Sequence, residues 1–163
     1  MSKIGYFLAL KSEQLEALVR EPASVGEFLE IAVDEQDELG GDFLDIDKSW
    51  QGIHFLLTGT LEAGEQPLGW AVFAPTAIGE DTAHGRARML TVEQVAEVHK
   101  ALIAIPADKL KRKCDWQLMN DREIYPGGWR AGDESYITDN FTSLKKFYEA
   151  AARKRMAVVQ WVG

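Results

Sequence analysis

Apolar residues recur at helical spacing in five stretches of this 163-residue chain, which predicts five amphipathic helices. The first predicted helix opens at Ser12 and the second at Ser24, with Pro22 between them. Ser24 and Glu27 have the spacing of a capping box, in which two side chains satisfy free backbone N–H groups at a helix start. The acidic stretch 34–47 contains paired glycines, and we expect it to be an exposed loop.

The third predicted helix, residues 47–59, is apolar on more than one side. One of its faces carries four large side chains at helical spacing: Trp50, Ile53, His54 and Leu57. Phe55 points nearly the other way, so this helix is expected to be buried. Asp45 or Asp47 can cap its start, and Gly59 can adopt the left-handed conformation that ends a helix.

The last two predicted helices lie in the second half of the chain. One follows Thr91, at capping-box spacing from a glutamine, and its apolar face carries Val92, Val95, Ala96, Val98, Leu102 and Ile103. The other spans about 139–155, with acidic residues near its start and basic residues at its end, as the helix dipole favours. One or two short helical turns are expected in 107–119. Beyond them, Pro126-Gly127 has the order typical of a type II turn.

Three runs of apolar, aromatic and β-branched residues predict strands at 3–10, 67–73 and 156–162. The polar stretch 78–90 is expected to be a loop. Strands at both ends and in the middle, with helices clustered between them, indicate an α+β fold. We therefore predict a single compact domain over residues 1–163, with helices packed against a mixed or antiparallel sheet.

The chain is acidic, with 26 acidic and 18 basic residues and a formal net charge of −8. This charge repels the phosphate backbone of nucleic acids and attracts a basic protein partner. The single cysteine, Cys114, cannot form an intramolecular disulfide, and no apolar run reaches the ~20 residues that cross a bilayer. We therefore expect a cytoplasmic protein that binds neither nucleic acid nor membrane.

Candidate chemistry centres on histidines, because no motif for a metal, a phosphate-binding loop or a nucleophile is present. His54 can be a catalytic base or a metal ligand, or a buried residue with one satisfied ring nitrogen, and the second reading is favoured. His84 lies in a polar stretch with Glu80, Asp81, Arg86 and Arg88, which could bind a carboxylate or phosphate or could pair among themselves. No metal or cofactor is predicted.

Three motifs together resemble the YfbM-like family of uncharacterised bacterial proteins: DKSWQGIHFLLTG at 47–59, IGEDTAHGRARMLT at 78–91 and EIYPGGW at 123–129. The resemblance covers nearly the whole chain and implies a small single α+β domain without a known activity. If the three motifs converge, they would form a cleft lined by His54, Glu80, Arg88, Glu123 and Tyr125, with Trp50 and Trp129 beside it. The alternative is an architecture of turns and buried polar pairs.

Two functional hypotheses follow. The leading one is a non-enzymatic binding protein that contacts a basic protein, for instance as an acidic inhibitor. The alternative is a small enzyme or ligand-binding domain in which His54 is a base, Glu80 or Glu123 orients it, and Arg88 binds an anion; its ligand is unknown. The position of His54 separates the two, because a base that is sealed in the core cannot reach a substrate.

Overall fold

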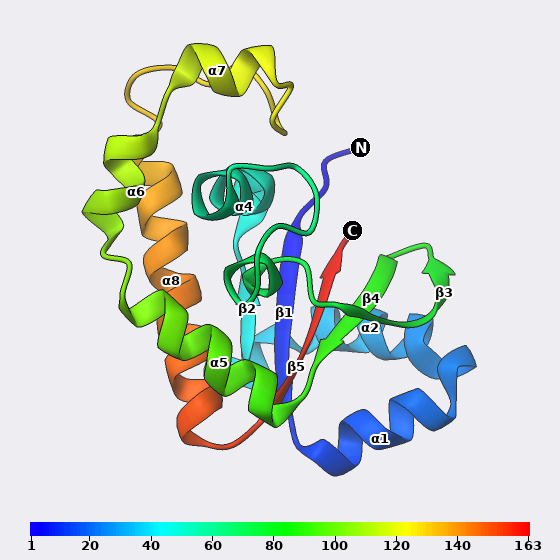
Figure 1. The fold of residues 1–163 in the computed structure, drawn as a ribbon. Helices are drawn as coiled ribbons and strands as arrows, with labels where there is room; N and C mark the ends of the chain where they lie inside the picture. Colours follow the sequence, from blue (N-terminus) through cyan, green and yellow to red (C-terminus); the bar gives the residue numbers. More distant parts are fainter.

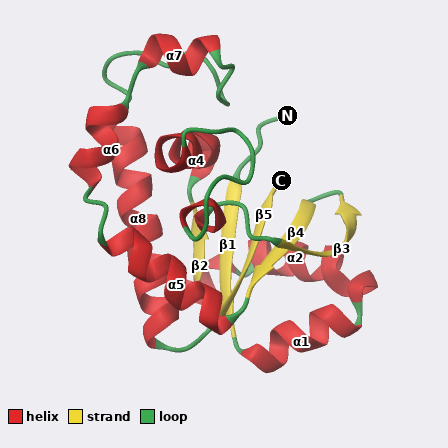
Figure 2. Cartoon of the chain, in the orientation of Figure 1, coloured by secondary structure: helices red, strands yellow, loops and turns green.

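A computed structural model describes residues 1–163 and contains one five-stranded sheet between two groups of helices (Figures 1 and 2). The strand order is β2-β1-β5-β4-β3, and every neighbouring pair is antiparallel. The strands are β1 Gly5–Leu10, β2 Phe43–Asp45, β3 Thr76–Thr82, β4 Gly85–Leu90 and β5 Ala157–Val162. The predicted α+β class with N-terminal, central and C-terminal strands is therefore confirmed, and the sheet is antiparallel.

Eight α-helices and four short 3-10 turns connect and cover these strands. The helices are α1 Ser12–Arg20, α2 Val25–Asp34, α3 Gln36–Leu39, α4 Trp50–Thr58, α5 Val92–Ile103, α6 Ala107–Lys113, α7 Trp116–Asp121 and α8 Glu134–Arg153. The 3-10 turns are Pro22–Ser24, Gly40–Asp42, Asp47–Ser49 and Leu68–Ala71. No helix combines the length and the continuous hydrophobicity of a membrane-spanning segment.

The two terminal strands lie side by side in the sheet, where β5 occupies the central position (Figure 1). β1 runs antiparallel to β5 along its whole length, from Gly5 opposite Val162 to Leu10 opposite Ala157. Both strands are almost wholly buried, and their side chains alternate between the two faces of the sheet. Residues that are about 150 positions apart in the sequence pair here, so this is a long-range contact. Both groups of helices pack on the sheet that it forms.

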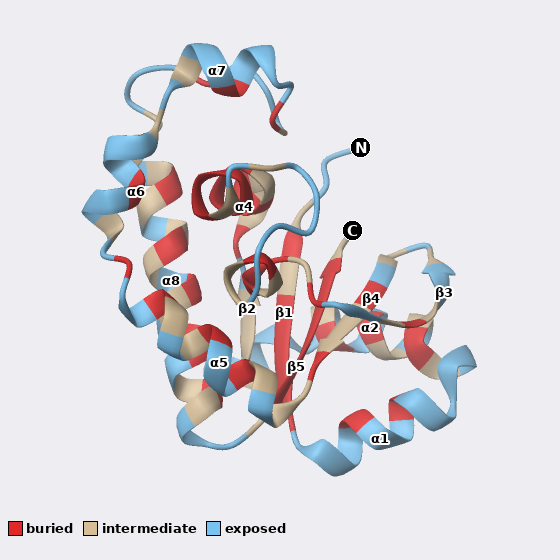
Figure 3. Cartoon of the chain, viewed as in Figure 1, coloured by how far each residue is buried: buried red, intermediate tan, exposed pale blue.

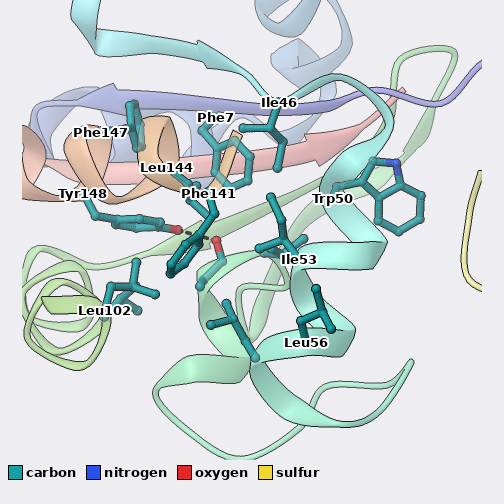
Figure 4. Packing of buried hydrophobic residues seen from close by; sticks show 14 of the residues in the cluster. Phe7, Ile46, Trp50, Ile53, Leu56, Leu102, Phe141, Leu144, Phe147 and Tyr148 are labelled. Carbon is teal, nitrogen blue, oxygen red and sulfur yellow. Dashed lines mark hydrogen bonds between the residues drawn. The ribbon is translucent and has the colours of Figure 1, made fainter. Parts of the chain in front are cut away.

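Each face of the sheet is covered by its own hydrophobic cluster. On one face, α4, α5 and α8 surround a core that includes Phe7, Phe141 and Leu144, seen in Figure 4 between the sheet and the helices. On the other face, α1 and α2 cover a smaller cluster around Leu29 and Val159. In Figure 3 the buried positions follow the inner sides of these helices, which is the pattern that helical hydrophobic spacing predicts.

A polar pair joins the sheet to α8 inside the larger core. Gln160 of β5 is almost fully buried, and its amide accepts a hydrogen bond from the Ala74 N–H at 2.6 Å. The same amide donates to the Trp70 carbonyl and to the Tyr148 hydroxyl, both at 2.7 Å. Tyr148 in turn donates to the Ala71 carbonyl at 2.8 Å, the bond drawn in Figure 4. Two side chains thus satisfy the backbone of residues 70–74.

This pair explains why the predicted strand at 67–73 is wrong. Leu68–Ala71 forms a 3-10 turn, and the backbone of this segment bonds to the side chains of Gln160 and Tyr148 instead of to a neighbouring strand. The strands in the middle of the sequence are β3 and β4, which take up most of the stretch 78–90 that was predicted to be a loop. Its polar sequence suits a hairpin at a sheet edge, where charged side chains face solvent and discourage association.

Several predicted boundaries are also wrong. The acidic stretch 34–47 includes α3 and the edge strand β2, because β1 supplies the backbone partners. α8 begins at Glu134 and not near 139, since Tyr136 and Ile137 have tertiary contacts that extend the helix. Ile103 is 62% exposed, because Leu102 takes the buried face of α5.

The predicted caps and turns have mixed outcomes. The Thr91 capping box and the left-handed Gly59 are confirmed. Ser24 and Glu27 form no capping box, because the Ser24 hydroxyl donates to the Glu21 carbonyl in a 3-10 turn. Neither Asp45 nor Asp47 caps α4. The turn at Pro126 is not type II: its Gly127 N–H donates to the Ile124 carbonyl, which puts the cis proline at the third position.

Removing the Tyr148 hydroxyl tests the buried polar pair. We expect Tyr148→Phe to lower the free energy of unfolding by about 1–3 kcal/mol, because the Gln160 amide loses a partner in a site without solvent. Tyr6→Phe is the matched control, since the Tyr6 hydroxyl has no hydrogen bond within the protein, and it should change stability by less than about 0.5 kcal/mol. Urea denaturation monitored by circular dichroism measures both, and equal effects would contradict the role assigned to Gln160.

Candidate functional site

His54 lies on the inner side of α4 and has no exposed surface. Its ring packs edge to face against Phe73, with 4.6 Å between the ring centroids. The Nε2 atom is hydrogen-bonded to the Glu62 carbonyl in the loop that follows α4. Because a carbonyl can only accept, Nε2 carries the proton, and Nδ1 is left without a partner in the core.

These surroundings keep the His54 imidazole neutral. Burial lowers its pKa below the ordinary value of 6.5, and the hydrogen bond to the Glu62 carbonyl only partly opposes that effect. The ring holds the loop after α4 against the helix, and it cannot reach a molecule in solvent. From this position His54 acts as a packing element, and a base for catalysis would have to come from elsewhere.

The first and third motifs meet beside His54. The Trp50 indole stacks on the Tyr125 ring with 5.4 Å between centroids, and it donates to the Lys3 carbonyl at 3.0 Å. The Tyr125 hydroxyl accepts from the Lys3 N–H at 2.7 Å, and the Tyr125 N–H donates to the Gln51 side chain. The two aromatic residues therefore clamp the segment that leads into β1. In Figure 4 the Trp50 ring lies at the outer end of the core cluster.

Trp129 completes the contact between the third motif and α4. Its indole donates to the Ile124 carbonyl at 2.8 Å, and its backbone exchanges two hydrogen bonds with the Asn120 side chain. A Cβ atom at Gly52 would lie 3.2 Å from the Trp129 ring, so the glycine in the first motif allows the close approach. The positions matched by the first and third motifs thus form an interior contact.

The second motif is the β3–β4 hairpin, and only part of it lies near His54. Arg88 stands opposite Gln160 in the sheet, and its guanidinium donates to the Ala74 carbonyl at 3.2 Å. It lines a hollow of about 360 Å³ together with residues of the 61–66 loop and with Trp70, Phe73, Ala74 and Pro75. We call this space the Arg88 hollow. Phe73 and Glu62 both line it and both contact His54, so His54 lies directly behind its wall.

The other charged candidates lie on the surface. Glu80 and Glu123 are exposed, and neither forms an ion pair with Arg88. His84 lies in the β3–β4 turn, where its ring approaches Glu30 of α2 at 4.0 Å. The structure therefore separates the predicted residues into an interior group around His54, a lining residue, Arg88, and exposed carboxylates.

Sequence reasoning missed the roles of Gln160 and Tyr148. The available signal was a glutamine in the otherwise apolar strand AVVQWV, because a buried polar side chain needs partners. Cys114 is half-buried, and burial raises the pKa of its thiol to about 11, with a further contribution from the Glu134 carboxylate. Its basic neighbours therefore do not activate it. No group of three or more His, Cys, Asp or Glu side chains is placed to hold a metal ion.

Taken together, these features define a small α+β protein whose first and third motifs form one interior junction, with the second motif as a hairpin at the sheet edge. A family model described as a domain of unknown function, DUF1877, matches residues 1–161. The chain belongs to this family. It is similar to Protein YfbM of Escherichia coli strain K12, with 30% identity over 131 residues, which are 78% of this chain and 75% of that protein.

A solved structure has the same fold as this chain. The crystal structure of a protein of unknown function, YfbM from Escherichia coli, matches with a TM-score of 0.74 at 23% identity. The match covers 98% of this chain and 99% of that chain. The predicted resemblance to the YfbM-like family is therefore confirmed, and it extends over the whole fold.

Acid pH tests the environment of His54. The folded-state pKa is lowered, so the unfolded chain binds a proton more readily, and stability should fall as the pH drops below about 6.5. The contribution of one such group is at most about 1.4 kcal/mol per pH unit. Urea denaturation between pH 8 and pH 5 should show this loss in the wild type and a smaller one in His54→Gln. His84→Gln is the control, and the idea fails if His54→Gln keeps the wild-type pH dependence.

Proposed function

We propose that this chain is a non-enzymatic binding protein that docks a basic protein partner on residues 21–47, which we call the acidic segment. The segment holds ten of the 26 acidic residues and none of the 18 basic residues. The remainder of the chain therefore carries 16 acidic and 18 basic residues, so the whole negative balance comes from 27 consecutive residues. This concentration of charge is the observation that carries the proposal.

The placement of the segment supports the proposal. Eight of its ten carboxylates are on exposed residues, which run from Glu21 through α2 and α3 to the end of β2 at Asp45. Along α2, Glu27, Glu30 and Asp34 recur on the side opposite the buried residues, and Ile31 is 46% exposed among them. Only Glu30 and Asp42 have basic neighbours, His84 at 4.0 Å and Lys154 at 2.7 Å.

A mixed surface of this kind suits protein recognition. Charge accelerates the encounter with a basic surface, and an exposed aliphatic side chain supplies apolar area once water is displaced. The protein would act by covering its partner, as an acidic inhibitor does. The sealed His54 and the unactivated Cys114 are consistent with a role that requires no chemical step. The proposal assumes a cytoplasmic protein, in which a single free cysteine is ordinary.

Charge neutralisation tests the acidic segment. A face variant removes four exposed carboxylates from α2 and α3: Glu27→Gln, Glu30→Gln, Asp34→Asn and Glu38→Gln. A matched control removes four exposed carboxylates elsewhere: Glu97→Gln, Asp121→Asn, Asp139→Asn and Glu149→Gln. Both variants change the net charge by the same amount, so a difference between them reports position and not overall charge.

Affinity capture from a bacterial lysate at low salt, with quantitative mass spectrometry, provides the measurement. We expect the wild type and the control variant to retain the same basic protein, and the face variant to retain at least about tenfold less of it. Raising the salt to about 0.5 M should release it, because exposed charges are screened. The proposal fails if the wild type retains no basic protein, or if the two variants lose it equally.

A further inference from the structure

The Arg88 hollow shares no residue with the acidic segment and has the size of a small-molecule site. Its volume of about 360 Å³ falls near the lower end of the ~300–1,000 Å³ range of ligand pockets. One wall is the loop after α4, which the buried His54 holds in place through the Glu62 carbonyl. A second part of the lining is the backbone around Ala74, which Gln160 holds. Both are therefore anchored to the core.

Arg88 brings an unsatisfied cation to this hollow. A guanidinium has five N–H donors in a planar fork, and the structure pairs Arg88 with a single acceptor, the Ala74 carbonyl. No carboxylate lies within 4 Å of it, although the chain has 26 acidic residues. The Ala74 contact limits how the half-buried side chain can turn. The remaining donors are available to an acceptor that does not belong to this chain.

Arg86 adds a second cation on the same face of β4. The two arginines are two residues apart on one strand, so their side chains project to the same side of the sheet. Both line a smaller adjoining hollow of about 170 Å³, which shares Phe73 and Arg88 with the first. Arg86 is exposed and has no ion-pair partner. Neighbouring like charges without counter-ions favour an anion between them.

The rest of the lining narrows the class of anion. The Phe73 and Trp70 rings and Leu61 offer flat apolar contact for the body of a ligand. Glu62 is the one acidic residue of the hollow, and its charge works against ligands with several negative charges. The combination suits a singly charged anion on a planar apolar body better than a polyphosphate.

We propose that the Arg88 hollow binds a small monoanionic organic acid, with its carboxylate on the Arg88 guanidinium, assisted by Arg86, and its apolar body against Phe73 and Trp70. A planar carboxylate can accept two parallel hydrogen bonds from one guanidinium, which a single anchoring contact to Ala74 leaves free. This site is separate from the acidic segment, and it does not depend on the proposed protein partner.

Two matched probes test the charge requirement. 1-Naphthoate and 1-naphthamide have the same ring system, and only the first carries a negative charge. Titration of the whole protein with each, followed by ¹H–¹⁵N NMR, should give saturable shifts around Arg88 and Phe73 with naphthoate. We expect naphthamide to bind about tenfold more weakly or worse, because a charge-assisted hydrogen bond is replaced by a neutral one. The absence of saturable naphthoate binding at about 5 mM would overturn the proposal.

Three variants locate the site. Arg88→Gln should weaken naphthoate binding by about tenfold or more, and Arg86→Gln by only about threefold, because its exposed charge is screened. Arg20→Gln is the matched control, since Arg20 lines a separate hollow of about 600 Å³ between α1 and the start of α5, and it should leave the affinity unchanged. Arg88→Lys keeps the charge without the planar fork and should fall between the wild type and Arg88→Gln.

The pattern across the variants decides the outcome. Circular dichroism melts establish whether each variant folds. If Arg88→Gln does not fold, the affinity of Arg88→Lys is measured in its place. Unchanged naphthoate affinity in the folded Arg88 variant would overturn the proposal. An equal loss of naphthoate affinity in Arg20→Gln and in the Arg88 variant would also overturn the proposal, because the probe would then not be specific for the Arg88 hollow. Equal affinities for naphthoate and naphthamide would mean that apolar contacts alone hold the probe. That result would contradict the proposed contact between a carboxylate and Arg88.

Discussion

The buried amide of Gln160 is the interaction on which the arrangement of this protein depends. It lies on the central strand β5 and bonds to Ala74, Trp70 and Tyr148, and so ties the sheet to the 3-10 turn and to α8. A buried amide must satisfy its donors and acceptor, and these bonds meet that requirement within the chain. Gln160 accepts from the N–H of Ala74, and the carbonyl of the same residue receives Arg88, so a structural bond in the core anchors the residue that positions a charged side chain at the surface.

A second feature is that the residues of the family motifs in the interior and the charged residues on the surface have different roles. The first and third motifs place their aromatic residues and His54 in one interior junction, where they stabilise the entry to β1 and the loop after α4. The charged groups of the two proposed sites lie elsewhere: the carboxylates of the acidic segment and the guanidinium groups of Arg86 and Arg88 on β4. The acidic segment and the Arg88 hollow share no residue, so the two surfaces can attract different kinds of molecule.

Much of the fold could be predicted from local pattern. The terminal strands, α1, α4 and α5 were predicted because their apolar residues recur at periods of 2 or 3.6, and a period reports which face is buried. The burial of α4 on more than one side followed from Phe55 lying opposite Ile53. The hairpin β3–β4 was missed because an edge strand carries exposed charges and resembles a loop in sequence. The 67–73 segment was misassigned because its backbone partners are side chains that lie more than 70 residues away.

The sequence by itself determined the class of fold, the family, the burial of α4 and the uneven charge along the chain, since these depend on composition, order and periodicity. Only the tertiary structure decided which polar residues meet. It sealed His54 against the Glu62 carbonyl, left Glu80 and Glu123 apart from Arg88, and brought Arg88 to the hollow beside Phe73. Such meetings depend on the register of β4 against β5 and on the path of loops, and these are set by packing across the whole core.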